Sequence, residues 1–263
     1  MSDVQSSQSI GKDSLGILQL LSESVSVYLK GIWLFIPVSA ALLVGLTLLN
    51  YAVFGNLLTA SPEEMFASPW AIAGFISSIL VGIVASAFMV GFLALAAYDI
   101  RLGRSIRMGT YVAVAIRSAP MLFVLSLIMG IAISIGMLLL VVPGVILMLM
   151  WSVVAPVVVI ERAGFGSLSR SSGLTKGFRW PILGFYVLAF LAMMIVGAIL
   201  GGVAGFGFSA LFQTPTGFGF LMMQTLINSI TTAYFSVAQV SLFARLKELK
   251  EGVGMSDLAE IFG

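Results

Sequence analysis

The chain has 263 residues, of which 60% are hydrophobic and 9% are charged, and its mean hydropathy is +1.13. A soluble domain carries about 25% charged residues, so this composition indicates a protein that lies in a lipid bilayer. Neither Cys nor His is present, which excludes disulfides, thiolate chemistry and catalysis by histidine. Uncharged runs occupy most of the chain, so too few residues remain for a catalytic globular domain. We therefore expect a protein that is not an enzyme and binds no cofactor or metal.

The N-terminal segment, residues 1–30, is polar and has no apolar run of the signal-peptide kind. Its apolar residues between Ile10 and Leu29 recur at helical spacing, namely Ile17, Leu18, Leu21, Val25 and Leu29. This pattern predicts an amphipathic helix that lies on the membrane surface. A polar tail with chance periodicity is the alternative.

Six stretches are apolar enough to cross a bilayer, for which about 20 residues suffice. They are residues 31–54, 70–98, 118–142, 144–160, 181–208 and 218–244, followed by a tail at 245–263. The third and fourth stretches form one uncharged run. We divide it at Pro143 and Gly144 because proline stops a helix and glycine permits a reversal. The fold class is therefore an all-α bundle of six transmembrane helices at 31–244. Four spans with re-entrant segments are the alternative.

The fourth stretch contains Pro156, which has no N–H group. Proline leaves a carbonyl one turn earlier without its helical partner. Because lipid offers no hydrogen bonds, we expect this carbonyl to be satisfied inside the bundle.

Six spans place both termini on the same side as two basic loops, residues 99–117 and 161–180. All thirteen Lys and Arg then fall on that side: Lys12, Lys30, Arg101, Arg104, Arg107, Arg117, Arg162, Arg170, Lys176, Arg179, Arg245, Lys247 and Lys250. The positive-inside rule makes this side cytoplasmic. The sequence therefore predicts a multi-pass protein of a cytoplasmic membrane with both termini inside.

The two basic loops are candidates for binding anionic lipid headgroups, which attract each nearby cation by about 1 kcal/mol. The candidate residues are Arg101, Arg104, Arg107, Glu161, Arg162, Arg170, Lys176 and Arg179. Charge that only sets topology is the alternative. Glu161 and Arg162 follow the fourth span directly, and a pair with Arg170 or Lys176 would hold the loop at the interface.

Small residues recur at every fourth position on two spans, and such stripes let helices approach closely in lipid. They are Gly74, Ser78, Gly82 and Ser86 on the second span, and Gly197, Gly201 and Gly205 on the fifth. We expect them to pack within the chain, together with Pro143 and Gly144. A homodimer interface or another membrane protein as partner is the alternative.

Polar residues follow one face of the last span: Gln224, Asn228, Thr231, Thr232 and Gln239. They can line a solute pathway or make hydrogen bonds between helices. No Asp, Glu, Lys or Arg lies inside a predicted span, which argues against proton or ion coupling. Nothing in the sequence indicates binding to nucleic acid.

The segment from Pro143 to Pro181 resembles the signature of a family of bacterial integral membrane proteins without assigned activity. The family includes the YciC-like proteins and the membrane domain fused to some glycerophosphoryl diester phosphodiesterases. The matching positions are Glu161, Arg170, Ser171, Leu174, Thr175, Gly177 and Trp180, and Ser172 stands where the family usually has Trp. The resemblance implies a bacterial inner-membrane protein. It does not imply phosphodiesterase activity, which belongs to the fused domain.

Two functions fit these observations. The first is a non-enzymatic protein that organises or senses membrane lipid, or binds a protein partner, through its basic cytoplasmic loops. The alternative is a permease or channel for a neutral or lipid-like solute, with the stripe from Gln224 to Gln239 along its path.

Overall fold

The computed structural model describes residues 15–54, 63, 69–212 and 218–252, and no β-strand occurs among them. The helices are α2 (Ile17–Lys30), α3 (Ile32–Phe54), α5 (Pro69–Arg101), α6 (Met108–Leu139), α7 (Val141–Met150), α8 (Val154–Pro156), the π-helix η2 (Val157–Glu161), the 3-10 helix η3 (Gly164–Gly166), α9 (Ser167–Thr175), α10 (Arg179–Phe212) and α11 (Phe218–Glu251). In this part of the chain six helices can cross a membrane, namely α3, α5, α6, the run from Val141 to Glu161, α10 and α11. The prediction of an all-α, multi-pass membrane protein is confirmed.

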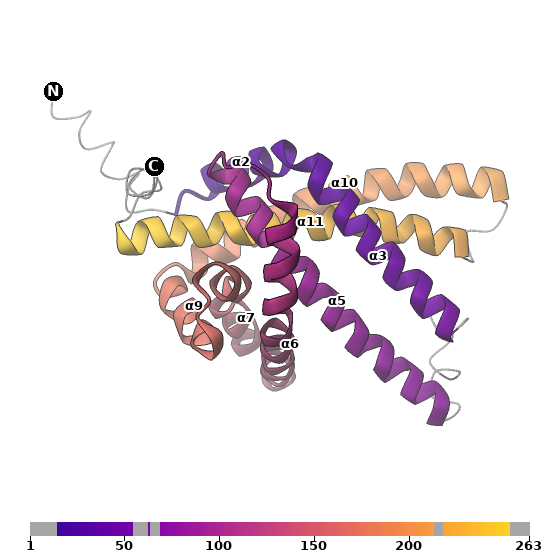
Figure 1. Cartoon of the computed structure of the whole chain (residues 1–263), viewed down its shortest axis with the longest axis horizontal. Coiled ribbons are helices and arrows are strands. Elements are labelled where there is room, and N and C mark those ends of the chain that lie inside the picture. The colour runs from indigo at the N-terminus through magenta and orange to yellow at the C-terminus, as the bar shows by residue number, and fades with distance from the viewer. Residues whose placement is uncertain (1–14, 55–62, 64–68, 213–217, 253–263) are drawn as a thin grey trace.

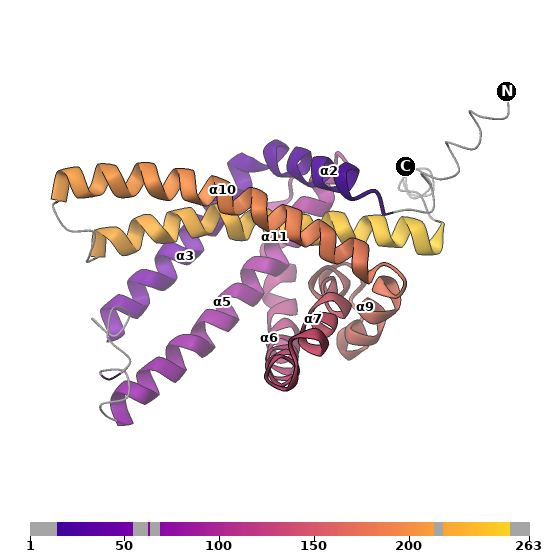
Figure 2. The ribbon, with the colours of Figure 1, turned by 180° about the vertical axis from the view of Figure 1, so that it is seen from behind.

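Helix α11 lies at the centre of the molecule, where it packs against α2, α3, α5 and α10 (Figures 1 and 2). Its buried part runs from Ser229 to Leu246 and is rich in Ala and Ser, which allow close approach of neighbouring helices. The half of α11 that precedes this part lies beside α10 in both views (Figures 1 and 2). It also contacts α3, because the Thr47 and Thr225 hydroxyls lie 3.3 Å apart and the rings of Tyr51 and Phe218 are 4.8 Å apart.

Helix α2 forms within the predicted N-terminal segment but also packs on the bundle. Its buried face contacts α11, where the Ser24 hydroxyl lies 3.3 Å from the Tyr234 hydroxyl and the Tyr28 hydroxyl donates to the Ile230 carbonyl at 3.3 Å. Burial raises the pKa of Tyr28 to about 12. The residues expected to face the membrane include Leu18 and Leu29, and both are exposed. The sequence pattern thus missed the face of α2 that docks on the protein.

Helix α6 begins at Met108, before the predicted start of the third span at Ser118. The predicted basic loop at residues 99–117 is therefore helical from Met108 onward, which corrects the expectation of a loop there. In the structure Tyr111, Ala115 and Ser118 are buried at helical spacing against α5, whereas Arg117 is exposed. A single arginine on the exposed side of a helix does not interrupt it.

The chain breaks at Leu140 rather than at Pro143 and Gly144, which corrects the predicted boundary. Leu140 is extended, with φ −160° and ψ 140°, and α7 begins at Val141. Pro143 therefore lies in the first turn of α7, where its missing N–H has no helical partner to lose.

Gly144 serves the contact between α6 and α7 rather than the reversal. A Cβ atom added to Gly144 would lie 2.5 Å from Cγ and 2.8 Å from the backbone nitrogen of Met137. On the other side, a Cβ added to Gly136 would lie 3.0 Å from the Cα of Gly144. The two helices of this hairpin touch through their backbones, so glycine is required there.

Helix α11 continues to Glu251, beyond the predicted end of the last span at Ala244. Leu242, Leu246 and Leu249 continue the apolar periodicity of the helix, and Leu246 is fully buried. The basic residues after Ala244 therefore belong to the same helix as the last span rather than to a separate tail. Helix α10, at Arg179–Phe212, is likewise longer than the predicted 181–208.

The stripes of small residues contribute little to packing within the described chain. No atom of the described residues lies within 4 Å of a Cβ added to Gly82, Gly197, Gly201 or Gly205. Gly74 is buried, Ser78 is half-buried and Ser86 is exposed. The expected packing within the chain is therefore absent at these four glycines, and the homodimer alternative stays a prediction.

The substitution Gly144→Ala tests the contact between α6 and α7. We expect it to lower the free energy of unfolding by about 1–3 kcal/mol because the added methyl group meets a backbone atom. The control is Gly130→Ala on α6, where an added Cβ meets nothing within 4 Å. Thermal unfolding of the purified protein in detergent measures both, and equal unfolding temperatures for the two variants would contradict the close contact.

Candidate functional site at the charged end of the bundle

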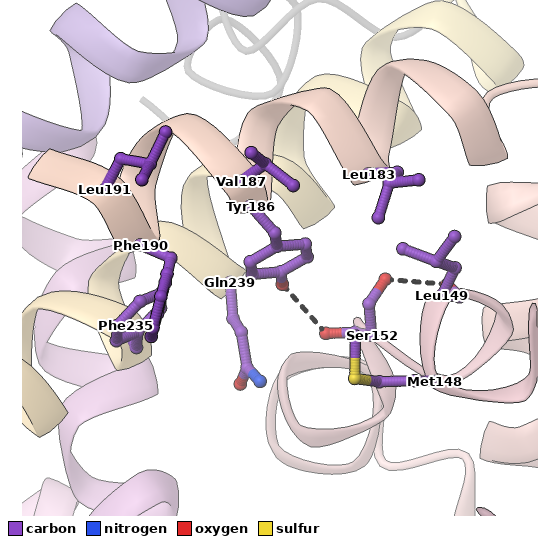
Figure 3. A pocket seen from close by; sticks show the side chains of 10 residues that line it. All are labelled: Met148, Leu149, Ser152, Leu183, Tyr186, Val187, Phe190, Leu191, Phe235 and Gln239. Atoms are coloured by element: carbon purple, nitrogen blue, oxygen red, sulfur yellow. Dashed lines mark hydrogen bonds between the residues drawn. The ribbon is translucent and has the colours of Figure 1, made fainter. Parts of the chain in front are cut away.

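The span from Val141 to Glu161 is interrupted, and the interruption is closed by side chains from other helices. Pro156 leaves the Ser152 carbonyl without its helical donor, and the Tyr186 hydroxyl of α10 donates to this carbonyl at 3.4 Å (Figure 3). This confirms the expectation that the carbonyl freed by Pro156 is satisfied inside the bundle. The helix then continues as the π-helix η2, which ends at Glu161.

Helix α9 docks on the same interruption. The Ser171 hydroxyl donates to the Met150 carbonyl, the last of α7, at 2.8 Å, and the Thr175 hydroxyl lies 3.3 Å from the same oxygen. Leu174 is buried between these contacts and the bundle. Gly177 follows with φ +91°, a conformation that favours glycine, and turns the chain into α10. The motif residues Ser171, Leu174, Thr175 and Gly177 thus fasten α9 to the broken span.

The charges at this end of the bundle form three clusters, and we call this part of the molecule the charged end. In the first cluster Arg170 of α9 binds Glu161 through two hydrogen bonds of 2.8 and 3.0 Å and also pairs with Glu251. Lys247 reaches Glu161 at 3.1 Å. The hydrogen bonds from Arg170 to Glu161 raise the pKa of the guanidinium above its ordinary value. This cluster ties η2, α9 and the end of α11 together, and it contains the predicted pair of Glu161 and Arg170.

The second cluster centres on Arg101, the last residue of α5, whose side chain is 6% exposed. Its guanidinium lies 2.7 Å from the carboxylate of Glu23 in α2 and 3.4 Å from that of Glu248 in α11. It also donates to the Ser241 carbonyl at 2.9 Å. One buried arginine therefore links three helices that are far apart in sequence.

The third cluster surrounds Asp99, which is 5% exposed. The Tyr111 hydroxyl of α6 donates to its carboxylate at 2.9 Å, and Arg107 and Arg104 lie 3.4 and 3.9 Å from it. The connection between α5 and α6 is thus held by one buried carboxylate.

These clusters divide the predicted lipid-binding residues into two groups. Five of them pair within the protein: Arg101, Arg104, Arg107, Glu161 and Arg170. The other three, Arg162, Lys176 and Arg179, make no ion pair with a described residue. Arg101 and Arg170 therefore stabilise the fold, whereas no described carboxylate offsets the charge of the second group. Arg104 and Arg107 share the one carboxylate of Asp99 and are 46% and 55% exposed, so part of their charge is also available to a ligand.

A groove of about 280 Å³ between α6 and the turn after η2 contains two such available cations. Arg117 lines it from α6 and Arg162 from the turn, and both side chains are exposed and without an ion pair to any described residue. Below them the wall is apolar and includes Met121, Val158 and Val159. Sequence reasoning counted Arg117 as loop charge and missed this site. The helical spacing of Tyr111, Ala115 and Ser118 was the signal that could have placed it on α6.

The predicted polar stripe on α11 does not lie on one cavity. Gln224 and Asn228 are exposed, and the Thr232 hydroxyl donates to the Asn228 carbonyl within the helix at 2.8 Å. Gln239 lines a cavity of about 450 Å³ between α7, α10 and α11 and also a smaller one beside α5 and α6 (Figure 3). The members of the stripe therefore have separate environments.

Comparison with protein-family models, with curated proteins and with solved structures finds no match to this chain. The resemblance carried by the segment from Pro143 to Pro181 therefore stays a prediction, and the function has to be argued from the geometry.

The substitution Arg170→Gln tests the role of the first cluster. It removes both hydrogen bonds to Glu161 and the pair with Glu251, and we expect the free energy of unfolding to fall by about 1 kcal/mol, the upper end for partly exposed pairs. Arg162→Gln is the matched control, because it removes the same charge from a residue without an ion pair, and its effect should stay within about 0.5 kcal/mol. Thermal unfolding in detergent gives both values. Equal losses in the two variants would show that the cluster contributes no stability.

Proposed function

We propose that this chain is a non-enzymatic protein of a bacterial cytoplasmic membrane that binds anionic phospholipid in the groove between Arg117 and Arg162. In this role it senses or organises the lipid of the leaflet that faces its charged end. The single observation behind the proposal is that two arginines without an ion pair to any described residue share a groove that is otherwise lined mostly by apolar side chains. Such a site matches a molecule with a phosphate at one end and a hydrocarbon chain at the other.

The chemistry of the two side chains favours a phosphate. A guanidinium presents several N–H donors in a plane and binds phosphate oxygens through paired hydrogen bonds. Two of them in one groove can neutralise a phosphodiester and keep a net positive charge for a second anionic group. The apolar wall formed by Met121, Val158 and Val159 then accommodates the first part of an acyl chain.

The backbone of Arg162 supports a ligand-binding role. Its φ is +55°, and it is the only non-glycine residue with positive φ among those the structure describes. A helix usually ends with Gly or Asn in this conformation, and another residue there costs roughly 1–2 kcal/mol. Strained residues of this kind cluster at functional sites. The π-helix that Arg162 terminates is also a feature found often at such sites.

The surroundings of the charged end support a location at the membrane surface. Trp33 and Trp180 lie next to Gly31–Ile32 and Arg179, at the ends of their spans, and are 90% and 81% exposed. Exposed tryptophan is typical of the headgroup region. On α2 the exposed face holds Leu18, Val25 and Leu29, which favours insertion of this helix into the interface. The positive-inside rule then makes this surface cytoplasmic.

The double substitution Arg117→Gln and Arg162→Gln tests the groove. At about 1 kcal/mol for each cation near an anionic surface, we expect retention of phosphatidylglycerol to fall by about 2 kcal/mol, or roughly 30-fold. Native mass spectrometry of the protein in detergent with added phosphatidylglycerol measures the retention. Neither arginine has an ion pair with a described residue, so the unfolding temperature should not change.

The matched control is Lys30→Gln with Lys250→Gln, which removes the same charge from two exposed lysines outside the groove. In this variant the retention of phosphatidylglycerol should fall by less than about threefold. If both double variants lose phosphatidylglycerol equally, binding depends on overall charge and the groove has no special role.

Membrane orientation has its own test, which the absence of Cys makes simple. A cysteine introduced by Glu63→Cys should react with a maleimide that does not cross membranes when it is added to intact cells. A cysteine introduced by Lys176→Cys should react only after the cells are permeabilised. Labelling of the second variant in intact cells would refute the cytoplasmic location of the charged end.

A further inference from the structure

The cavity of about 450 Å³ between α7, α10 and α11 lies apart from the groove at Arg117 and Arg162. Figure 3 shows Tyr186 and Gln239 facing it from α10 and α11, with Ser152 opposite. Its volume falls within the range of about 300–1,000 Å³ that is common for ligand sites. The remaining walls are Leu, Val, Phe and Met side chains, so the site is apolar with a few polar groups.

One of those polar groups has no hydrogen-bond partner among the described residues. The Tyr186 hydroxyl donates to the Ser152 carbonyl, and the Ser152 hydroxyl donates to the Leu149 carbonyl at 2.9 Å. The amide of Gln239 is half-buried and makes no hydrogen bond with a described residue. An amide has two N–H donors and a carbonyl acceptor. It can therefore donate to a ligand carbonyl and accept from a ligand hydroxyl in the same place.

The depth of the cavity limits the charge of its occupant. Gln239 precedes Arg245 on α11 by about 9 Å, at 1.5 Å per residue. The cavity therefore lies below the charged end, beside the hydrocarbon of the membrane, and no Asp, Glu, Lys or Arg is among the described residues that line it. A charged group is costly at such a depth without a partner of opposite sign. The part of the ligand that enters is uncharged.

We propose that this cavity binds a neutral lipid, with its hydroxyl or ester group hydrogen-bonded to the Gln239 amide and its hydrocarbon against Phe190 and Phe235. The lipid enters from the bilayer, because Val187 and Phe190 are exposed at the surface of α10 that borders the cavity. This inference goes beyond the proposed function, since it concerns another site and an uncharged ligand.

Binding of radiolabelled 1-monooleoylglycerol to the purified protein in detergent micelles tests the inference. The wild-type protein should bind this probe saturably. Gln239→Leu removes only the hydrogen-bonding group, and it should weaken binding about tenfold, the equivalent of about 1.4 kcal/mol for one lost hydrogen bond. Gln239→Met should do the same and replaces the first variant if that does not fold. Val187→Trp fills the cavity and should also weaken binding.

The matched control is Gln224→Leu, the same substitution on an exposed residue of the same helix, which should leave binding unchanged. Binding within twofold of wild type in the Gln239 variants overturns the inference, as does equal weakening in Gln224→Leu or the absence of saturable binding. Arg117→Gln with Arg162→Gln should retain monooleoylglycerol while losing phosphatidylglycerol. Failure at either site is therefore distinguishable from failure at the other.

Discussion

Inside a bilayer a backbone carbonyl that leaves a helix has no water to bind and must find a donor within the protein. The span from Val141 to Glu161 contains an interruption between α7 and α8, and two of its carbonyls are satisfied from elsewhere in the chain. Tyr186 of α10 donates to Ser152, and Ser171 and Thr175 of α9 donate to Met150. Because these donors come from two helices, the interruption fixes where α9 and α10 lie. The cavity at Gln239 follows from that arrangement, because α10 forms one of its walls.

The charged end combines two kinds of basic residue with different roles. Arg101 and Arg170 are held by carboxylates from other helices, so their charge is offset and their contribution is to the fold. Arg117 and Arg162 have no such partner among the described residues and share a groove. A uniform basic surface would attract anionic lipid without selecting a place for it. The groove differs from the other basic residues because it places two such arginines beside apolar side chains.

The two proposed sites differ in depth and therefore in chemistry. The groove lies where the guanidinium groups remain accessible, and it fits a phosphate. The cavity at Gln239 lies farther from the charges, and a neutral amide is the group in it that makes no hydrogen bond with a described residue. A protein with both can respond to the headgroup composition and to the neutral lipid content of the same leaflet. Neither site requires a solute to cross the membrane.

The sequence by itself determined the all-α class, the number of spans and the separation of charge from apolar surface, because these follow from composition and from the length of uncharged runs. It also identified the backbone carbonyl that Pro156 leaves without a helical donor, and the pair of Glu161 and Arg170, since both arise within a short segment. The break at Leu140, the start of α6 at Met108 and the end of α11 at Glu251 were decided by packing against other helices.

The two proposed sites were likewise decided by packing between helices. Arg117 and Arg162 are brought together by the contact of α6 with η2, and Gln239 gains its environment from α7 and α10. Periodicity reports which side of a helix is apolar, whereas only the tertiary structure decides which neighbour that side meets and which polar groups remain without a partner.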